Sequence, residues 1–583
     1  MTDRGRLRSA EWFAGDDEVA VVNRVALRNA GLEPDPSGER PVIGIADSAS
    51  DLNPCNLPLR PLAAHVRDGV LAAGGIPVVF PTMSLGEDLM KPTAMLYRNL
   101  LAMEVEETLR SYPLDGIVLL GNCDKTIPGA LMGAASADLP TLVVTGGARP
   151  VALFRGRRVG TGTDLWRAWD DYRAGRLNEA AWNEFERCLA CGAGACNTMG
   201  TASSVAVVVE ALGLALPGTA TIPAGAPEQA AAARAAGARC VALVADDVRP
   251  SALLTASGFA NAVRVLNAVG GSTNVLIHLA AIAGRVGIDL GPDEIGRLSA
   301  DVPVLADVEP SGSFLVHDFH TAGGVPLVIK ELGDLIDREA PTVTGMSLGV
   351  ATDEQLVAGV AGQVGGAIRP ATAPLRDGGA FAVVHGSLAP DGAVLKTSAA
   401  SESLFRHTGP ALVFSSYQEM TQRIDDPDLD VTADTVLVLR GCGPVGAPGM
   451  PEWGMVPVPA KLSAQGVVDM VRVTDARMSG TSFGTVFLHV APESAVGGPL
   501  ALVRDGDLVS VDVAAGRLDL DVAADELQRR RAKWQEPASE HLRGWPALYR
   551  SHVLQAPAGC DLDFLRAPTP AHRRFVPPVV GRS

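Results

Sequence analysis

The sequence predicts an α/β protein in which a parallel-sheet α/β domain, with a helical subregion, is followed by a β-rich, barrel-like domain. Over residues 41–150, short apolar runs alternate with amphipathic stretches, a pattern typical of a parallel sheet with crossover helices. After about residue 380, short apolar runs are separated by Gly, Pro and Asp turns, which favours a barrel or sandwich. A chain of 583 residues is also too long for a single hydrophobic core.

The first domain is predicted to contain four strands, each a short apolar run suited to burial on both faces. We expect these strands at residues 41–46, 77–80, 116–120 and 141–144. Apolar residues at helical spacing predict helices between them, at 60–74, 91–112 and 128–138. Residues 200–290 are Ala-rich and interrupted by glycines, and they predict the helical subregion with one strand at 240–245.

The second domain is predicted from short apolar runs bounded by turn residues. These runs lie at residues 381–384, 411–414, 435–439, 486–490 and 508–513. The sequence pattern changes to these short apolar runs in or just after the stretch 370–379. We therefore expect two domains, of residues 1–380 and 381–583.

Charge and composition exclude several classes of partner. A net charge of −17 argues against nucleic acid or an anionic membrane, because both attract basic patches. The first 13 residues are charged and lack the apolar core of a signal peptide, and the apolar run at 205–216 is too short to span a bilayer. We therefore expect a cytoplasmic protein whose eight cysteines are reduced thiols or metal ligands rather than disulfides.

Polar segments with ligand-type side chains follow the first three predicted strands. Cys55 follows the first strand, Glu87 follows the second, and Cys123, Asp124 and Lys125 follow the third. Because the carboxyl ends of parallel strands share one edge of a sheet, where ligands usually bind, we expect these side chains to converge. Their convergence is a stronger signal than any one of the segments alone.

The other cysteines have plainer interpretations. A lone cysteine usually packs as a small apolar residue, which is what we expect of Cys240, Cys442 and Cys560. The run that contains Cys188, Cys191 and Cys196 resembles a compact zinc or iron–sulfur ligand set, but it has no fourth ligand nearby. We expect the first two to end a helix and pack, which leaves Cys196 free to bind a metal.

Seven segments of the sequence resemble the dihydroxy-acid/sugar-acid dehydratase family. The segments LNPCN, GNCDKT and GACNTMGTASS are similar to the three cluster-binding motifs of that family. The resemblance continues in the same order through residues 270–285, 390–401, 443–454 and 473–484. It covers nearly the whole chain and implies a hydro-lyase.

Two branches of that family are open. Residues 7–13, 196–202 and 552–564 look like the branch that dehydrates aldonic acids such as L-arabinonate or D-xylonate to 2-keto-3-deoxy acids, which is therefore preferred. The alternative is the dihydroxy-acid dehydratase of branched-chain amino-acid synthesis. An electron-transfer protein is disfavoured because it usually has four protein ligands per cluster, and a zinc-loaded regulatory relative because it would need basic charge to bind nucleic acid.

The resemblance implies cofactors and roles for individual residues. Cys55, Cys123 and Cys196 would hold a [2Fe–2S] cluster that acts as a Lewis acid. Mg²⁺, which prefers oxygen ligands, would be bound by Glu87, Asp124, Glu452 and a Lys125 modified to a carbamate. Ser479 would be the base, assisted by Thr481.

Each of these residues also has a plainer interpretation. Most carboxylates are exposed and only solvated or capping, an unmodified Lys125 would pair with Asp124, and a Ser-Gly-Thr-Ser run is commonly a turn. The resemblance further implies a homodimer or homotetramer whose other partner is the sugar-acid substrate.

Overall fold

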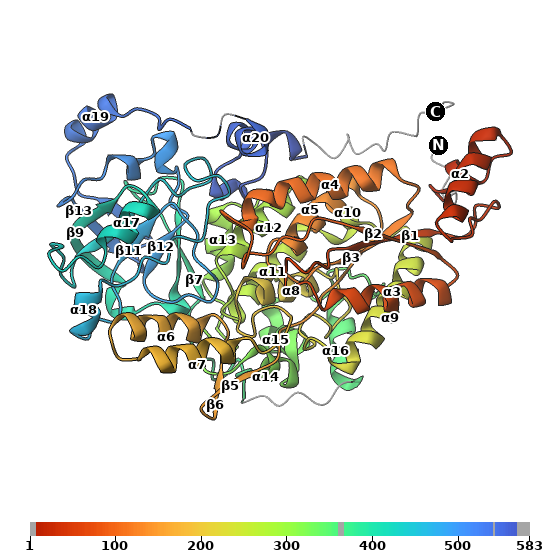
Figure 1. The fold of residues 1–583 in the computed structure, drawn as a ribbon, viewed down its shortest axis with the longest axis horizontal. Coiled ribbons are helices and arrows are strands. Elements are labelled where there is room, and N and C mark those ends of the chain that lie inside the picture. Colours follow the sequence, from red (N-terminus) through yellow and green to blue (C-terminus); the bar gives the residue numbers. More distant parts are fainter. Residues whose placement is uncertain (1–6, 359–365, 540, 542, 568–583) are drawn as a thin grey trace.

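A four-stranded parallel sheet forms one end of the molecule, with the strand order β2-β1-β3-β4 (Figure 1). The computed structural model describes residues 7–358, 366–539, 541 and 543–567. Residues 1–6, which belong to the N-terminal segment predicted to lack a signal peptide, lie outside the described residues. The strands are β1 (Val42–Asp47), β2 (Ile76–Pro81), β3 (Gly116–Leu120) and β4 (Thr141–Val144). The predicted parallel α/β sheet is confirmed, and the ends of β1, β2 and β3 open on one edge.

Helices cover both faces of this sheet (Figure 1). On one face α3 (Leu59–Ala72) packs against β1 and β2, and α9 (Pro227–Ala245) packs against β3 and β4. On the other face lie α4 (Arg98–Ser111), preceded by a 3₁₀ turn at Ala94–Tyr97, and α5 (Thr126–Ala137). Helices α3 and α9 cross at Gly69 and Gly237, where an added Cβ would lie 1.9 and 2.1 Å from backbone oxygens. Only glycine permits that approach.

The strand expected at residues 240–245 is wrong, because this stretch forms the last turns of α9. Its apolar run was ambiguous, since a short continuous run suits a buried strand and a buried helix equally. In the structure Ala233, Ala236, Cys240 and Leu243 are buried at spacings of three and four residues, which is helical periodicity. The run therefore faces the sheet as one side of a long helix.

The predicted helical subregion is present between the two sheets. Its central helix, α12 (Asn274–Arg285), is buried along its whole length, so it forms part of the core rather than of the surface. The other helices are α8 (Thr201–Ala211), α10 (Pro250–Leu253), α11 (Ala256–Ala268), α13 (Pro292–Ser299), α14 (Val316–Thr321), α15 (Gly324–Leu332) and α16 (Leu348–Ala358).

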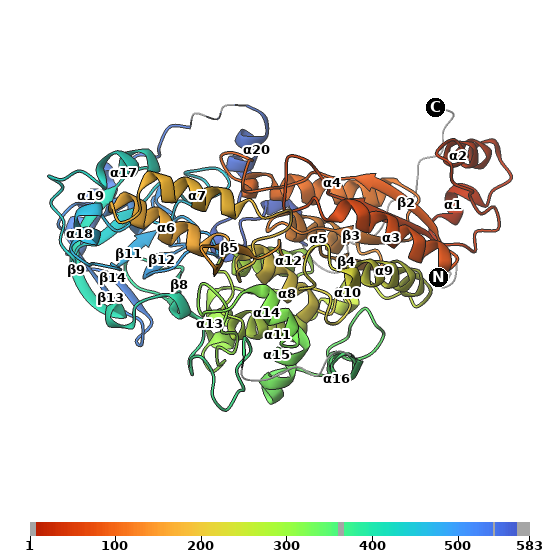
Figure 2. The ribbon, with the colours of Figure 1, turned by 60° about the horizontal axis from the view of Figure 1, so that its bottom comes forward.

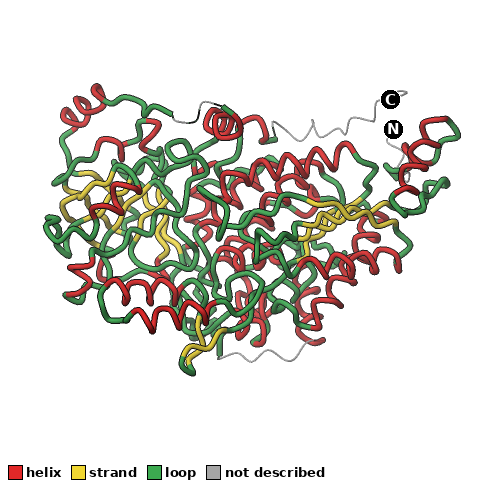
Figure 3. The backbone as a smooth tube through the Cα atoms, in the orientation of Figure 1, coloured by secondary structure: helices red, strands yellow, loops and turns green. Residues whose placement is uncertain are grey.

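A second sheet of eight strands forms the other end of the molecule, and Figure 3 shows the two sheets as separate regions. Its order is β14-β13-β9-β10-β11-β12-β8-β7, and a parallel bridge between His385 and Arg517 joins the β7 edge to the β14 edge. The predicted β-rich, barrel-like region is confirmed. The strands are β7 (Phe381–Val384), β8 (Ala393–Lys396), β9 (Arg406–Phe414), β10 (Val436–Leu439), β11 (Arg472–Thr474), β12 (Val486–Leu488), β13 (Leu508–Asp512) and β14 (Arg517–Leu520).

Helices from the segment between β4 and α8 lie beside the barrel (Figure 2). It consists of a hairpin, β5 (Ala152–Phe154) and β6 (Arg157–Val159), followed by α6 (Thr163–Arg173) and α7 (Glu179–Leu189). Arg173 forms an ion pair with Asp425, at 2.5 Å, just after the barrel helix α17 (Tyr417–Arg423). A segment from the first half of the chain is thus fixed across the second sheet.

The remaining helices of the second half are α18 (Ala460–Ala464), α19 (Ala524–Lys533) and α20 (Gly544–His552). After α20, the C-terminal segment returns to the first half of the molecule. The Arg98 guanidinium donates to the carbonyl oxygens of Gly559 and Cys560, and buried Arg285 pairs with buried Asp561 at 2.6 Å. At the N-terminus, α1 (Ala10–Phe13) and α2 (Glu18–Asn29) lie beyond the parallel sheet (Figure 2). The predicted boundary after residue 380 stays a prediction.

No helix among the described residues is long and apolar enough to cross a membrane. All eight cysteines are free. Cys240, Cys442 and Cys560 are fully buried, as expected of cysteines that pack as small apolar residues.

Lys396, at the end of β8, is fully buried, and its Nζ has no hydrogen-bond partner in the described part of the chain. Burial lowers its pKa from 10.5 to about 7, because the charged form is disfavoured in an apolar environment. Since the unfolded chain binds this proton more tightly, the penalty is complete below pH 7 and disappears as the pH rises toward 10.5.

We expect Lys396→Met to raise the free energy of unfolding at pH 7 by on the order of 4 kcal/mol. Thermal unfolding measured at pH 7 and pH 10 checks this, and the apparent Tm of the variant should exceed that of the parent by several degrees at pH 7 only. Lys330→Met, at an exposed lysine of α15, is the control without such a difference. A stabilisation that persists unchanged at pH 10 would contradict the explanation.

Candidate active site

Two asparagines fix the loops that carry Cys55 and Cys123, which follow β1 and β3. Asn56 Oδ1 accepts hydrogen bonds from the backbone N–H groups of Asn122 (3.1 Å) and Cys123 (2.9 Å). In return Asn122 Nδ2 donates to the carbonyl oxygens of Cys55 (2.7 Å) and Gly147 (2.8 Å). This reciprocal pair is buried, so the two cysteines are held in one fixed relation.

The loop between α7 and α8 brings the third cysteine, Cys196, to the same place. Its backbone is joined to the first loop by the Gly194 N–H, which donates to the Pro54 carbonyl (3.1 Å), and Arg149 N–H donates to the Ala195 carbonyl (2.8 Å). The Arg149 guanidinium then lies 3.8 Å from Cys55 Sγ and 3.8 Å from the Asp88 carboxylate. A cation thus stands beside the thiols.

The Cys55 thiol affects the ionisation of the other two cysteines. Contact with the Cys55 thiol, and then burial, raise the pKa of Cys123 well above its usual value. Burial raises the pKa of Cys196 to about 12, although the nearby Arg149 charge opposes this and Cys55 adds to it. Only the thiolate binds metal, and binding releases the proton, so a metal at Cys123 and Cys196 would have to displace the proton of each thiol.

Three carboxylates surround the buried Lys125, and all of them are predicted site residues. Lys125 Nζ lies 2.6 Å from Asp124 Oδ2, 3.2 Å from Glu452 Oε1 and 3.6 Å from Glu87 Oε2. Glu87 comes from the loop after β2, Asp124 and Lys125 from the start of α5, and Glu452 from the loop after β10. The two halves of the chain therefore meet at this cluster.

Three further residues hold these carboxylates, and we did not predict them. Thr93 Oγ1 donates to Glu87 Oε1 (2.5 Å), Asn274 Nδ2 donates to Glu452 Oε1 (2.6 Å), and Arg477 donates both to Glu452 Oε1 (2.8 Å) and to Thr93 Oγ1 (3.2 Å). Arg477 lies two residues before Ser479 and is fully buried. It links the acidic cluster to the serine loop.

The charges in this cluster depend on one another. Burial disfavours the Lys125 ammonium, but Asp124, Glu452 and Glu87 outweigh it and raise its pKa. Burial raises the pKa of Glu87. Burial also opposes ionisation of Glu452, yet Lys125 and Arg477 hold its pKa below the usual value. Mg²⁺ prefers oxygen ligands such as these carboxylates. In the structure, the positive charge that lies among the carboxylates is the Lys125 ammonium.

Within the described residues, no three His, Cys, Asp or Glu side chains are placed so that they could hold a metal ion. In the acidic cluster, Lys125 Nζ lies between the carboxylates and forms an ion pair with Asp124. Modification of Lys125 to a carbamate stays a prediction.

The predicted base loop follows Arg477, which donates to Glu452 of the acidic cluster. Ser479 Oγ is 2.9 Å from Thr481 Oγ1, and the Thr481 backbone N–H points to Ser479 Oγ at 3.4 Å. Behind the loop, an added Cβ on Gly480 would lie 2.6 Å from the Thr201 backbone N at the start of α8. The thiols and the carboxylates meet where Cys123 Sγ lies 3.5 Å from Asp124 Oδ1, and the serine loop is joined to the carboxylates through Arg477.

The other two cysteines of the ligand-like run lie elsewhere. Cys188 is in the last turn of α7 and Cys191 follows it, and their thiols donate to backbone carbonyls of Leu153 and Pro150. Both border a small apolar cluster around Phe185, which agrees with the expectation that they end a helix and pack.

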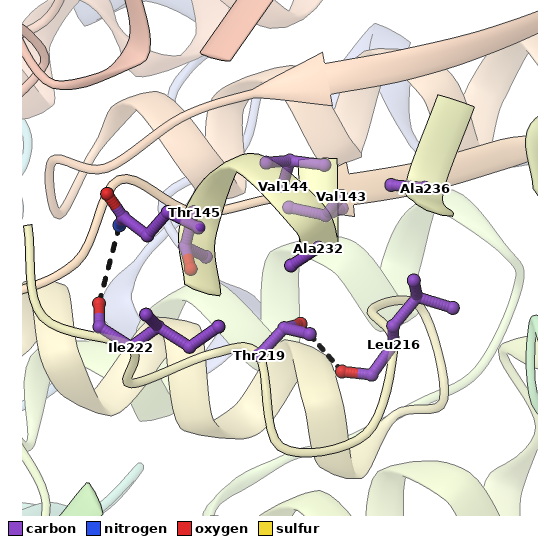
Figure 4. Close-up of a pocket in the computed structure, with 9 residues that line it drawn as sticks. Val143, Val144, Thr145, Leu216, Thr219, Ile222, Ala232 and Ala236 are labelled. Atoms are coloured by element: carbon purple, nitrogen blue, oxygen red, sulfur yellow. Dashed lines mark hydrogen bonds between the residues drawn. The ribbon is translucent and has the colours of Figure 1, made fainter. Parts of the chain in front are cut away.

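A small pocket at the end of β4 contains none of the predicted site residues (Figure 4). Val143, Thr145, Leu216 and Ile222 line it, and its volume is about 10 Å³, close to that of one water molecule. It is too small to be a substrate site.

Comparison with known proteins gives a match along almost the whole chain. The family model described as dihydroxy-acid/6-phosphogluconate dehydratase N-terminal matches residues 40–351, and its C-terminal counterpart matches 366–560. A 6-deoxy-6-sulfo-D-gluconate dehydratase of Pseudomonas putida is 48% identical, over 96% of each chain. An L-arabinonate dehydratase of Rhizobium leguminosarum is 47% identical, also over 96% of each chain. A dihydroxy-acid dehydratase of Moorella thermoacetica is 37% identical over 90% of this chain and 95% of its own.

Proposed function

Because the chain belongs to the dihydroxy-acid/6-phosphogluconate dehydratase family, it is a hydro-lyase, and we propose that it converts a sugar acid to the 2-keto-3-deoxy acid. The observation that carries the proposal is the site itself. Cys123 Sγ lies 3.5 Å from Asp124 Oδ1, three carboxylates surround Lys125, and Arg477, two residues before Ser479, donates to Glu452, so the thiols, the acidic cluster and the serine loop are linked through adjacent residues. The named sugar-acid dehydratases are 47–48% identical, against 37% for the dihydroxy-acid dehydratase, which favours an aldonate.

The reaction sets two chemical problems. Removing water from a 2,3-dihydroxy acid requires loss of the weakly acidic C2 proton and departure of the C3 hydroxyl, which is a poor leaving group. A general base within hydrogen-bonding reach of the C2 proton addresses the first problem. A positive charge beside the carboxylate also helps with the first problem, because it makes the C2 proton more acidic, and stabilisation of negative charge on the departing oxygen addresses the second.

The residues of the chain divide these tasks. Ser479, as its alkoxide, takes the C2 proton on Oγ, and Thr481 hydrogen-bonds to that oxygen. The C3 oxygen departs as hydroxide, takes the proton back from Ser479 Oγ and is released as water, which regenerates the alkoxide. The resulting enol tautomerises to the 2-keto-3-deoxy acid. Arg477, two residues from the base, keeps Glu452 and, through Thr93, Glu87 in position.

The donor sets suit two cofactors. Cys55, Cys123 and Cys196 would hold a [2Fe–2S] cluster, and Glu87, Asp124, Glu452 and a carbamylated Lys125 would hold Mg²⁺. When bound, the cluster supplies a Lewis acid, because three protein ligands leave one iron with an open position, and Mg²⁺ supplies positive charge for the substrate carboxylate. A carbamate would turn the ion pair at Lys125 into a fourth oxygen donor.

The assembly is part of the same proposal. We expect a cytoplasmic homodimer or homotetramer whose only other partner is the small-molecule substrate. Light scattering on the purified protein measures the oligomeric state directly.

We expect one or more aldonates to exceed 2,3-dihydroxyisovalerate in kcat/KM by at least about 100-fold, because a site built to bind extra hydroxyls rejects analogues that lack them. The measurement is formation of 2-keto acid by anaerobically purified protein with Mg²⁺. L-Arabinonate, D-xylonate, D-gluconate and 6-deoxy-6-sulfo-D-gluconate are the test substrates. Preference for 2,3-dihydroxyisovalerate would instead establish the branched-chain alternative.

A further inference from the structure

The start of α6 is built against the loop that carries Ser479 and Thr481. Thr163 Oγ1 donates to the Thr481 carbonyl at 3.0 Å. Gly162 has φ 104°, and a Cβ added there would lie 2.7 Å from the Thr481 side chain. The close approach requires glycine, so the first turn of α6 has a fixed position over Thr481.

One side chain of that helix reaches the Thr481 hydroxyl. Trp166 Nε1 lies 3.0 Å from Thr481 Oγ1, and Thr481 Oγ1 lies 2.9 Å from Ser479 Oγ. An indole N–H is a donor only. Thr481 Oγ1 must therefore be the acceptor toward Trp166.

This favours one direction for the second hydrogen bond. A hydroxyl has one proton and two acceptor positions, and the bond from Trp166 fills one of the acceptor positions of Thr481 Oγ1, which favours the arrangement in which the Thr481 proton points at Ser479 Oγ. The backbone N–H of Thr481 points at the same oxygen, at 3.4 Å. Ser479 Oγ thus faces two donors. Donors to an oxygen stabilise its anionic form.

We propose that Trp166 is a positioning residue that directs the Thr481 hydroxyl proton onto Ser479 Oγ and so makes Ser479 a base. This rests on the proposed function, in which Ser479 removes the C2 proton. Without the indole donor, the Thr481 hydroxyl can rotate and accept the Ser479 proton instead, which stabilises the neutral serine. A serine hydroxyl is a weak base unless something activates it.

We call the chain of hydrogen bonds from Trp166 through Thr481 to Ser479 the relay. Trp166→Phe tests it, because phenylalanine has an aromatic ring but lacks the N–H. We expect kcat at pH 7 to fall by about tenfold or more, as for loss of a hydrogen bond to a charged group. The pKa of Ser479 rises when a donor is lost, so the acid limb of the pH–kcat profile moves to higher pH. The difference in kcat between the variant and the parent should therefore become smaller as the pH increases, while KM and the visible absorption stay near those of the parent.

Trp169→Phe is the matched control. Trp169 lies one turn further along α6, packs in tilted ring contacts with Tyr172 and Trp182, and is 42% exposed. The same substitution there should leave the pH–kcat profile unchanged.

Thr481 variants test the relay without touching the helix. Thr481→Val removes the hydroxyl and should reproduce the pH-dependent loss of kcat. Adding Trp166→Phe to Thr481→Val should lower kcat no further. Thr481→Ser keeps the hydroxyl, so Trp166→Phe should remain harmful in that background.

Two contrary results have different meanings. If the parent enzyme dehydrates an aldonate and Ser479→Ala is inactive, a Trp166→Phe profile equal to that of Trp169→Phe overturns the relay alone. A deficit in Trp166→Phe that is the same at every pH also overturns it, since that indicates a merely structural role. If the parent dehydrates no sugar acid, the proposed function fails, and the relay fails with it.

Discussion

Ser479→Ala is expected to lower kcat by roughly 10²–10⁴-fold, the usual contribution of a positioned general base, which corresponds to about 3–5 kcal/mol of transition-state stabilisation. Ser479 Oγ contacts only Thr481 among the hydrogen bonds found in the described residues. Its removal therefore leaves the thiols, the acidic cluster and the barrel strands in place. Steady-state kinetics with the best aldonate is the measurement, alongside visible absorption and thermal unfolding.

Ser482→Ala is the matched control for Ser479→Ala. Ser482 lies in the same loop and is fully buried, but its Oγ has no hydrogen-bond partner among the described residues. We expect it to retain most of the parent kcat. If Ser479→Ala retains substantial activity, Ser479 is not the base.

Cys123→Ser is expected to abolish the visible absorption of the protein, reduce its iron content to a small fraction of the parent value, and remove dehydratase activity. Cys123 Sγ is buried beside Cys55, and a serine hydroxyl at that position is a much poorer ligand for iron than a thiolate. Absorption spectra and iron analysis of anaerobically purified protein check the ligand role without relying on turnover.

Cys191→Ser separates this role from the more conspicuous cysteine run. Cys191 donates to the Pro150 carbonyl and borders the apolar cluster around Phe185, so its replacement should leave the spectrum and iron content unchanged. An unchanged spectrum in Cys123→Ser, or a bleached one in Cys191→Ser, would reverse the assignment.

Local sequence patterns predicted most of the fold. Strands β3, β4 and β7 begin and end at the residues expected, because each is a short apolar run bounded by turn residues on both sides. The stretch 240–245 failed because an apolar run of six residues has no period of its own. Only its packing against the sheet, as the last part of a 19-residue helix, shows which structure it adopts.

The residues of the candidate site could be predicted for a different reason. Cys55, Glu87 and Cys123 follow strands of one parallel sheet, so topology alone brings them to one edge. The residues that hold them in place could not be predicted. Asn56 acts on Asn122, 66 residues away, and Trp166 on Thr481, 315 residues away, and Arg477 acts on both Glu452 and Thr93, 25 and 384 residues away. Nothing within a local window distinguishes such residues from ordinary polar or aromatic ones.

The order in which the site residues leave the ribosome has a consequence for cofactor loading. All three cysteines lie before residue 200, whereas Glu452, Arg477 and Ser479 come from loops of the barrel. About 280 residues separate Cys196 from Ser479, and synthesis at roughly 5–20 residues per second takes some 15–60 s over that distance. The thiols are thus made before Glu452, Arg477 and Ser479. Under the proposed function, a metal could therefore be loaded onto the cysteines before the loops that complete the site have been synthesised.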